Sequence, residues 1–426
     1  MAQNVYLPAF NRYPASVMQA FGRIERARGV IESAPILPAQ EEILRQDALV
    51  GSIHYSNLIE GNELPRVEAL RAVKHELDPT DRAKLELVNY VAALEFIERA
   101  HREGTIAYSP EFLLHLHGVL TKGLGREGTR FLPRHEGAWR DGNIVVADAI
   151  QVYHEGPPAD EVPNLMAERL SWLEGKRLSD EYPGPIVAGV GHFEINEIHP
   201  FADYNGRAAR LFAVAVLYRE GFMSRRLFSP ERYYAEDKDA YYQALRAIKR
   251  TRNLNNWLGY YVNGLASEFE RVAERVAQLS RLTHSLPLPL QLTDSQDKAV
   301  AALTVEGMRA LTIPEYVELT GVSPRTASRE LNALAEAGVL RARGTTRDRR
   351  FVLPVARTPS GGRPPTWTDE RIRRSLTNLI EELGRWPVYR DFEAKSLLPL
   401  YAAIQRTGGE ARWKPELQPS IPSYKN

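Results

Sequence analysis

The segment from His199 to Arg210 brings together, in one short run, the side chains needed for chemistry on a phosphate-linked group; it reads His-Pro-Phe-Ala-Asp-Tyr-Asn-Gly-Arg-Ala-Ala-Arg. An imidazole can accept a proton from an attacking hydroxyl near neutral pH, and the carboxylate of Asp203 suits a Mg2+ that bridges phosphates. Asn205 and Gly206 allow a tight turn, and Gly206 lets the backbone approach an oxyanion closely. The arginines would spread the charge that develops on the transferred group.

Two helices are expected to hold this run. Apolar residues at helical spacing predict one helix from Ile186 to Ile198 and another from Ala208 to Tyr218, so the charged run is a loop followed by a helix start. Free N–H groups and the dipole at a helix N-terminus favour an anion. Arg207 and Arg210, three residues apart, lie on one face of the second helix. We therefore expect a phosphate to bind there.

The same residues allow two other interpretations. His199 could cap or pack inside a helical core while the arginines form surface ion pairs, which is the usual role of a single His or Arg but not of the whole run. A zinc protease would need His-Glu-x-x-His on one helix. His192, Glu194, Glu197 and His199 do not fall in that order.

The run resembles the signature loop of the Fic family, His-Pro-Phe-x-Asp/Glu-Gly-Asn-Gly-Arg-x-x-Arg. The resemblance implies transfer of AMP from ATP to a Ser, Thr or Tyr hydroxyl of a target protein, with His199 as general base and Phe201 as the core anchor of the loop. A tyrosine pair, Tyr241 and Tyr242, resembles the one beside the adenine, although tyrosines at helical spacing are more often core residues. The remaining implied roles are Mg2+ binding by Asp203, contact with the α-phosphate region by Asn205 and Gly206, and contact with the distal phosphates by Arg207 and Arg210.

Tyr204 is the one departure from this pattern, because the family usually has Gly there and some members have Ala. Its side chain is expected either to point out of the cleft or to crowd the phosphate path. A positive φ at this position would cost about 1–2 kcal/mol. Transfer of another phosphate-linked group therefore stays open beside AMP transfer.

A second motif lies far upstream, on a helix expected from Gln46 to Gly61 with a Gly-Asn stop. The residues from Ser56 to Gly61 resemble the inhibitory-helix motif Ser/Thr-x-x-x-Glu-Gly/Asn of many Fic proteins. The resemblance implies that Glu60 pairs with Arg210 and displaces the γ-phosphate, with Ser56 nearby, because a carboxylate competes with phosphate for the same guanidinium. Taken alone, Ser-x-x-x-Glu is an ordinary exposed pair, but its occurrence together with the loop pattern favours autoinhibition.

Between the two motifs, the stretch from Gly137 to Ala147 holds an Asp-Gly pair followed by a β-branched run, which predicts a turn and a strand. Fic proteins carry a β-hairpin flap in this place, which lays the target segment alongside as an added strand. A surface hairpin without a partner is the alternative. The candidate docking edge consists of Ile144, Val145 and Val146.

The composition of the chain limits which kinds of site and which cellular location are possible. The chain has 426 residues, 43% of them hydrophobic and 26% charged, with a net charge of +1 and no cysteine. Disulfides and cysteine–zinc sites are therefore excluded. No apolar run approaches the roughly 20 residues that cross a membrane, and the start from Met1 to Pro14 lacks the pattern of a signal peptide. We expect a cytoplasmic protein with no membrane contact, and the sequence does not decide whether subunits pair as a homodimer.

The predicted fold is mainly α, in about two to four domains. An N-terminal helical region (1–109) precedes a helical Fic core with the flap hairpin (110–280), a winged helix-turn-helix module (290–356) and a small helical unit (364–415). Proline-rich boundaries are expected at Ser285–Pro289 and Thr358–Pro365. The N-terminal helices are expected at Val17–Ser33, Ala39–Gly61, Arg66–His75 and Arg82–His101.

The stretch from Thr312 to Leu331 resembles a winged helix-turn-helix, with Ser323 as N-cap and Pro324 at the first helical position of a recognition helix. Basic residues there and in the wing suit phosphate contact, so residues 312–350 are a candidate DNA surface; protein docking or dimerisation is the alternative. A DNA-binding regulator whose pocket senses nucleotide without turnover is accordingly the second functional hypothesis. The tail from Trp367 to Trp413 resembles short helical repeats associated with homing endonucleases. Within residues 312–350, the side chains expected to face outward on the recognition helix are Arg325, Thr326, Ser328 and Arg329, and the wing adds Arg343, Arg347 and Arg349.

Overall fold

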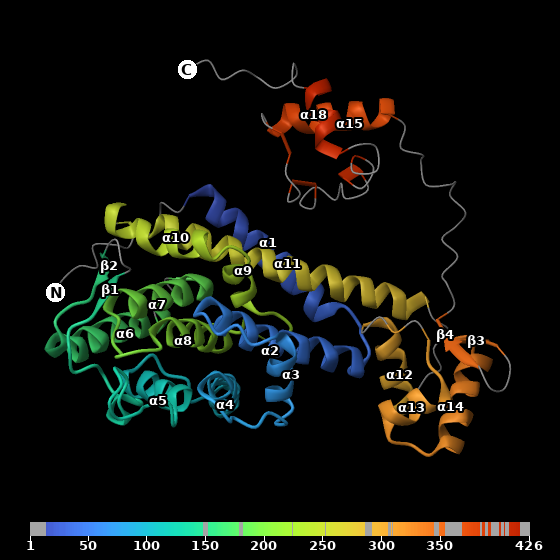
Figure 1. The fold of residues 1–426 in the computed structure, drawn as a ribbon, viewed down its shortest axis with the longest axis horizontal. Helices are drawn as coiled ribbons and strands as arrows, with labels where there is room; N and C mark the ends of the chain where they lie inside the picture. The colour runs from blue at the N-terminus through green and yellow to red at the C-terminus, as the bar shows by residue number, and fades with distance from the viewer. Residues whose placement is uncertain are drawn as a thin grey trace. The chain divides into compact units, whose positions relative to one another are not determined.

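A computed structural model describes most of the chain: residues 14–147, 152–178, 182–223, 225–251, 253–285, 292–305, 308, 310–344, 349–353, 369–383, 386–387, 391–392, 400–401, 404 and 409–417. Over these residues the fold is mainly α, as predicted, with two antiparallel hairpins (Figure 1). Internal contacts divide the chain into a unit of residues 1–354 and a unit of residues 355–426. None of the described helices is long and apolar enough to cross a bilayer.

Two helices at the centre of the first unit carry the signature run. Every residue of α7 (Gly184–Ile198) up to Ile195 is buried, and α8 (Asn205–Arg219) is buried along nearly its whole length. A helix that is apolar all round belongs inside a bundle. The surrounding helices are α4 (Arg82–Glu103), α5 (Pro110–Thr121), α6 (Val162–Leu178) and α11 (Asn255–Ser285).

The N-terminal helices form where they were predicted, with ends shifted by a few residues. They are α1 (Ala15–Ser33), which packs along α11, followed by α2 (Pro38–Ile59), α3 (Arg66–Val73) and α4. Local signals set their ends: Asp81 caps α4 by accepting from the Lys84 N–H at 3.0 Å, and Gly104 ends it with φ 68°.

Helix α2 contacts α8 near its C-terminal end, where Gly61 (φ 87°) follows the last turn. Its N-terminal end is held by α12 (Asp294–Thr304): the Ala39 N–H donates to Asp297 Oδ2 at 2.9 Å, and Gln40 Nε2 donates to Thr304 Oγ1 at 2.9 Å. The remaining helices of this region are α9 (Pro230–Glu236) and α10 (Lys238–Thr251), with short 3-10 turns at Pro133–His135 and Ala159–Glu161.

The flap hairpin is present as predicted. Strand β1 (Val145–Ala147) pairs antiparallel with β2 (Val152–Glu155), and Val146 lies opposite His154. The pairing register shifts between Val146 and Ala147, which marks a bulge or irregularity in the hairpin.

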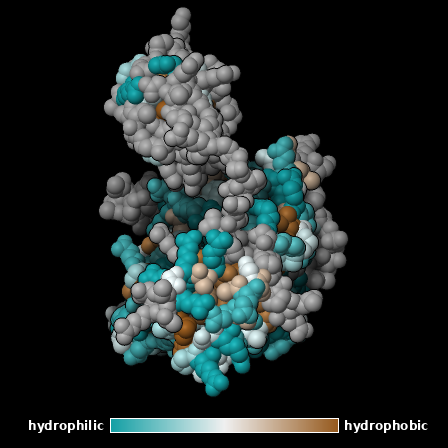
Figure 2. Space-filling model, turned by 90° about the vertical axis from the view of Figure 1, so that its right-hand side faces the viewer, coloured by the Kyte–Doolittle hydropathy of each residue, from teal (hydrophilic) through white to brown (hydrophobic). Residues whose placement is uncertain are grey.

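Residues 294–352 form, in order, a helix, a short helix, a turn, a helix and a hairpin. After α12 come α13 (Ile313–Thr320), α14 (Pro324–Glu336), β3 (Arg341–Arg343) and β4 (Arg350–Val352) around a core of their own. Ser323 caps α14 by accepting from the Thr326 N–H at 3.2 Å. Figure 2 faces this side of the molecule, where hydrophilic residues cover most of the described surface and apolar residues form small patches.

The second unit contains α15 (Asp369–Leu383) and α18 (Gly409–Leu417), with Leu376 and Trp413 in its apolar core. Most of the predicted boundary at Ser285–Pro289, all of that at Thr358–Pro365, and Arg347 of the predicted wing lie outside the described residues.

Candidate active site

The signature loop is framed by two residues in the left-handed region. His199 (φ 53°) ends α7, and Tyr204 (φ 65°) immediately precedes α8. Such conformations cost about 1–2 kcal/mol in residues other than glycine and concentrate at functional sites. One expectation is corrected here: Asn205 and Gly206 do not form a tight turn but begin α8, three residues before the predicted start at Ala208. Tyr204 makes the reversal instead.

The side chain of Asn205 closes the loop onto itself. Its Oδ1 accepts from the Phe201 N–H at 2.8 Å and its Nδ2 donates to the Phe201 carbonyl at 2.9 Å. Phe201 is fully buried, stacked on the His117 ring at 3.7 Å between centroids and beside Trp139 at 5.3 Å. Phe201 is therefore the core anchor that the Fic resemblance implied, and Asn205 fixes the backbone around it.

His117 supports the same loop from α5. Its Nδ1 accepts from the Gly137 N–H at 3.1 Å, so its Nε2 carries the proton and donates to the Asp203 carbonyl at 3.2 Å. Burial lowers the pKa of His117 to about 3. The ring is neutral at physiological pH and acts as a fixed strut.

Arg140 joins the loop to the flap. Its side chain is buried and donates from Nε to the His199 carbonyl at 2.9 Å, from Nη1 to the Gly142 carbonyl at 2.9 Å and from Nη2 to the Pro157 carbonyl at 2.5 Å. Its backbone N–H also donates to the Pro200 carbonyl at 2.9 Å. One guanidinium thus sets the position of the flap against the candidate base.

His199 is held as a neutral base. Its Nδ1 lies 3.2 Å from the Asn196 carbonyl, which can only accept, so Nδ1 carries the proton and Nε2 is the basic nitrogen. Burial lowers the pKa of His199, although the Asn196 carbonyl and the carboxylates of Glu60 and Asp203 act in the opposite direction. The imidazole is therefore ready to accept a proton at neutral pH.

Glu60 and Arg210 form an ion pair at the start of α8. Arg210 Nη2 donates to Glu60 Oε1 at 2.8 Å and to the Ser56 carbonyl at 3.0 Å, and Arg210 Nε donates to Ser56 Oγ at 2.8 Å. The Arg210 side chain is 1% exposed and that of Glu60 27%. Burial alone would raise the pKa of Glu60, but Arg210 and Arg207 outweigh it and hold that pKa below its usual value, so the carboxylate is ionised.

Gly206 leaves room for this carboxylate. A Cβ at residue 206 would collide with Glu60 Oε1, which lies against the first turn of α8. An anionic oxygen therefore already occupies the helix N-terminus where a phosphate was expected. The anion is the protein's own side chain.

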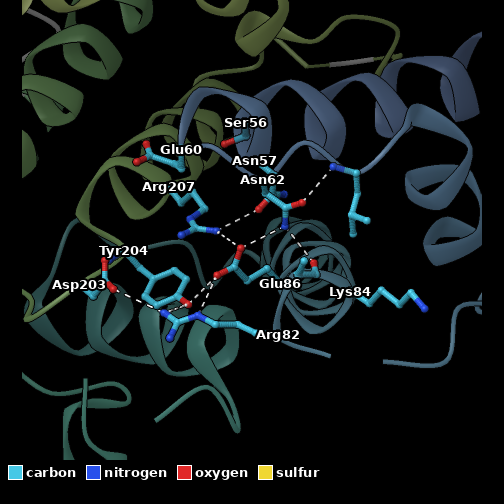
Figure 3. Close-up of polar contacts among 12 residues, drawn as sticks. Ser56, Asn57, Glu60, Asn62, Arg82, Lys84, Glu86, Asp203, Tyr204 and Arg207 are labelled. Carbon is cyan, nitrogen blue, oxygen red and sulfur yellow. Dashed lines mark hydrogen bonds and ion pairs between the residues drawn. The ribbon is translucent and has the colours of Figure 1, made fainter. Parts of the chain in front are cut away.

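Arg207 points to the same side of α8 but has different partners. Its Nη1 lies 2.9 Å from Glu86 Oε2 and donates to Asn57 Oδ1 at 3.1 Å, and its guanidinium stacks over the Tyr204 ring at 4.1 Å (Figure 3). Glu86 comes from α4 and Asn57 from α2. Both arginines therefore touch α2, one turn apart.

Comparison with known families decides what this region is. Residues 107–217 match the Fic/DOC family. This stretch is a Fic/DOC domain. The loop, the flap strand Val145–Ala147 and most of α8 lie within it.

Curated relatives match over part of their length. The protein adenylyltransferase Fic of Nematostella vectensis is 26% identical over 229 residues, 52% of this chain and 48% of that protein. A probable protein adenylyltransferase of Aquifex aeolicus (strain VF5) is 29% identical over 190 residues, 43% of this chain and 55% of that protein. The chain thus spans about half the length of the curated relatives it matches.

A solved structure is similar in fold to most of the chain. A crystal structure of a Fic family protein from Desulfovibrio desulfuricans G20 is 23% identical with a TM-score of 0.56, and the match covers 81% of this chain and 97% of that one.

Asp203 lies at the open side of the Fic loop. Its side chain is 50% exposed, its Oδ1 accepts from the Tyr204 N–H at 2.7 Å, and its Oδ2 lies 3.6 Å from Arg82 Nη2. No group of three or more His, Asp or Glu able to hold a metal occurs among the described residues. One carboxylate still fits a Mg2+ whose other ligands are phosphates and water.

The two tyrosines of the predicted pair differ in burial. Tyr241 is 1% exposed and its hydroxyl lies 2.9 Å from His192 Nε2, within an aromatic cluster. Tyr242 is half-buried, and the Glu60 carboxylate raises its pKa, after the larger effect of burial. After the larger effect of burial, Arg210 lowers and Glu60 raises the pKa of Tyr241 as well, so both tyrosines lie close to the Glu60–Arg210 pair.

The side chains of the candidate docking edge of the flap differ in exposure. Ile144 is 6% exposed, whereas Val145 is 45% exposed. Val146 lies in β1, and its side chain is outside the described residues. Only Val145 of the described side chains presents an apolar surface there.

Sequence reasoning missed several residues that shape the Fic site. All of them have polar side chains. Each lies either on an element remote in sequence from the loop or in a segment that the sequence analysis assigned to another role. Asn57 lies within the inhibitory motif at a position the motif leaves open, and Arg140 lies within the predicted flap. The missed residues are Asn57, Arg82, Glu86, His117 and Arg140.

Proposed function

We propose that this chain is a protein adenylyltransferase that transfers AMP from ATP to a hydroxyl side chain of a target protein and is restrained by Glu60. The names of its curated relatives support the reaction type. The observation that carries the proposal is the carboxylate of Glu60 against Gly206 and Arg210, because a site built around one anion can accept another.

In the proposed reaction, His199 Nε2 removes the proton from a Ser, Thr or Tyr hydroxyl. The resulting oxygen attacks the α-phosphorus, the bond from that phosphorus to the bridging oxygen breaks, and pyrophosphate leaves in line. Arg207 and Arg210 hold the distal phosphates and offset the charge on the leaving group. A Mg2+ on Asp203 would supply further neutralisation of phosphate charge when bound.

Glu60 restrains this reaction by competition. Its Oε1 takes the Arg210 Nη2 at 2.8 Å, so a triphosphate cannot reach the same nitrogen while the pair is intact. The pair joins α2 to α8 and therefore breaks only when Glu60 or the end of α2 moves.

The test compares Glu60→Gly with the unmodified chain, using ATP labelled at the α- or the γ-phosphate. We expect Glu60→Gly to raise self-labelling from α-labelled ATP at least about tenfold, the effect of freeing one charged phosphate contact. Glu63→Gly removes an exposed carboxylate three residues away and is the matched control. Adding His199→Ala to Glu60→Gly should abolish the label.

Each alternative gives a different result in the same assay. Label from γ-labelled ATP would indicate phosphorylation and overturn AMP transfer. No label from either nucleotide, with the fold intact, would favour the regulator that senses nucleotide without turnover. If the protein gains mass only when a different phosphate-containing donor replaces ATP, the reaction is transfer of another phosphate-linked group.

DNA contact by residues 312–350 is a second proposal, supported by exposed arginines on α14 and on the β3–β4 hairpin. A gel-shift titration at several salt concentrations tests it. Replacing Arg325 and Arg329 together with Ala should weaken binding and reduce the salt slope by about two, roughly one per lost phosphate contact. Arg281→Ala, on exposed α11 surface, is the control, and unchanged binding would favour protein docking. The exposed arginines are Arg325, Arg329, Arg341, Arg343, Arg349 and Arg350.

A further inference from the structure

The residue that departs from the Fic pattern is the centre of a buried polar network. Tyr204 is 3% exposed; its hydroxyl donates to Glu86 Oε1 at 2.8 Å and accepts from Arg82 Nη2 at 2.8 Å. Figure 3 shows the ring directed toward α4, on the side of the loop away from Glu60. The bulky side chain therefore does not lie beside the Glu60–Arg210 pair.

Glu86 links this tyrosine to Arg207. Its Oε1 accepts from Tyr204, and its Oε2 lies 2.9 Å from Arg207 Nη1 and accepts from Asn62 Nδ2 at 3.1 Å. Burial would raise the pKa of Glu86, but Arg207 and the hydrogen bonds outweigh it and lower that pKa. The carboxylate is therefore ionised and bound through both oxygens.

The guanidinium of Arg207 is nearly buried and is held at its Nη1. Glu86 and Asn57 share its Nη1, Tyr204 covers one face, and its side chain is 8% exposed. Its Nε is buried and has no hydrogen-bond partner among the described residues. A buried N–H without an acceptor is costly, so it is expected to gain one when a ligand binds.

From this geometry we infer that Glu86 and Tyr204 are positioning residues: together they orient Arg207 so that its Nε edge meets the distal phosphates of the nucleotide. The inference rests on the proposed function. It gives the two carboxylates opposite roles. Glu60 occupies the phosphate-binding side of Arg210, whereas Glu86 holds Arg207 at Nη1 and leaves its Nε for a phosphate. It also assigns a use to the tyrosine that stands where the family pattern has glycine.

The test measures dissociation constants of ATP and AMP by calorimetry in the full chain carrying Glu60→Gly. AMP lacks the distal phosphates, so the ratio of the two constants reports on Arg207 and not on general damage to the pocket. We expect Glu86→Gln to weaken ATP about tenfold while AMP is unchanged, because one charge-assisted contact that fixes a phosphate-binding guanidinium is lost. Tyr204→Phe keeps the stacking ring, loses only the hydroxyl bonds and should weaken ATP less.

The same helix offers a matched control. Glu98 of α4 also joins a tyrosine to an arginine: the Tyr218 hydroxyl donates to its Oε1 at 3.2 Å and Arg226 Nη1 donates to its Oε2 at 2.7 Å. Glu98→Gln should leave the ratio of ATP to AMP affinity unchanged. If both glutamine variants change the melting temperature by a similar amount and only Glu86→Gln changes the ratio, lower stability is not the cause of the changed ratio.

Opposite results overturn the inference. Tighter ATP binding in Glu86→Gln would make Glu86 a competitor of phosphate like Glu60, and an unchanged ratio would make the network purely structural. If Glu86→Gln fails to fold, the ratio in Tyr204→Phe decides between these outcomes. If the Glu60→Gly chain binds neither ATP nor AMP, the proposed function is wrong and the inference is wrong with it. If that chain binds both nucleotides and only the ratio stays unchanged in Glu86→Gln, the inference alone is wrong.

Discussion

Single residues in this site are fixed in defined protonation states by burial. His117 accepts a backbone N–H at Nδ1 and stacks on Phe201, so protonating it would break the strut under the loop. Its pKa of about 3 lies far below the value near 6.5 expected in the unfolded chain. Burial also lowers the pKa of His192 and of His199. The folded state therefore binds fewer histidine protons than the unfolded state in mild acid.

This difference predicts an acid-sensitive fold. The contribution of His117 is fully present above about pH 6.5 and is lost as pH falls from there toward pH 3, since the unfolded chain takes up the proton first. Between pH 7 and pH 5 it should reduce the free energy of unfolding by about 2 kcal/mol. His117→Gln should remove that part of the pH dependence, measured by denaturant unfolding at both pH values. An equal pH dependence in the variant would contradict the assignment.

At the scale of elements, the flap and the loop are coupled through one side chain. Strand pairing between β1 and β2 is short, and a short two-stranded hairpin is marginal by itself. Arg140 adds bonds from its guanidinium to the hairpin at Gly142 and Pro157 and to the loop at His199. The position of the flap beside the candidate base therefore depends on this arginine.

Arg140→Lys should loosen the flap, because an ammonium cannot reach acceptors spread around a planar guanidinium. Hydrogen exchange at the Gly156 amide, which donates to the Ile144 carbonyl at 3.1 Å, should accelerate about tenfold or more. Arg134→Lys, which alters the exposed pair with Asp141, is the control. Exchange that is equally slow in both variants would mean that strand pairing alone holds the hairpin.

At the scale of the whole first unit, α2 connects the region of residues 294–352 to the candidate site around Arg210. One end of the helix is held by α12 and the other presents Glu60 to Arg210. Gln40 is fully buried at the first end, where its Nε2 donates to Thr304 Oγ1 and its Oε1 accepts from the Leu37 N–H and Thr283 Oγ1. This one side chain joins α2, α11 and α12.

Gln40→Ala should therefore lower the stability of the unit by about 1–3 kcal/mol, the cost of leaving buried polar partners unsatisfied. A lower midpoint of thermal unfolding would measure it. Gln278→Ala, at an exposed position of α11, should leave the midpoint unchanged. If both variants melt like the unmodified chain, the contact between α2 and α12 contributes nothing to stability.

The sequence by itself determined the features that depend on near neighbours. The run from His199 to Arg210, the motif ending at Glu60 and the caps at Ser323 and Gly61 are local patterns, and local backbone preferences place them on the helices where they were expected. The Glu60–Arg210 pair was predicted from a family resemblance, because helical periodicity does not show which residues of two distant helices meet.

Only the tertiary structure decided which remote side chains surround that run. Glu86 and Asn57 reach Arg207 from helices far away in the chain, and no spacing rule connects them to it. Whether Tyr204 would crowd the phosphate path was likewise open, because the direction of a side chain in the left-handed region is set by what packs around it. Packing selects among orientations that the local sequence leaves nearly equal in energy, so these contacts exist only once α2, α4 and α8 have assembled.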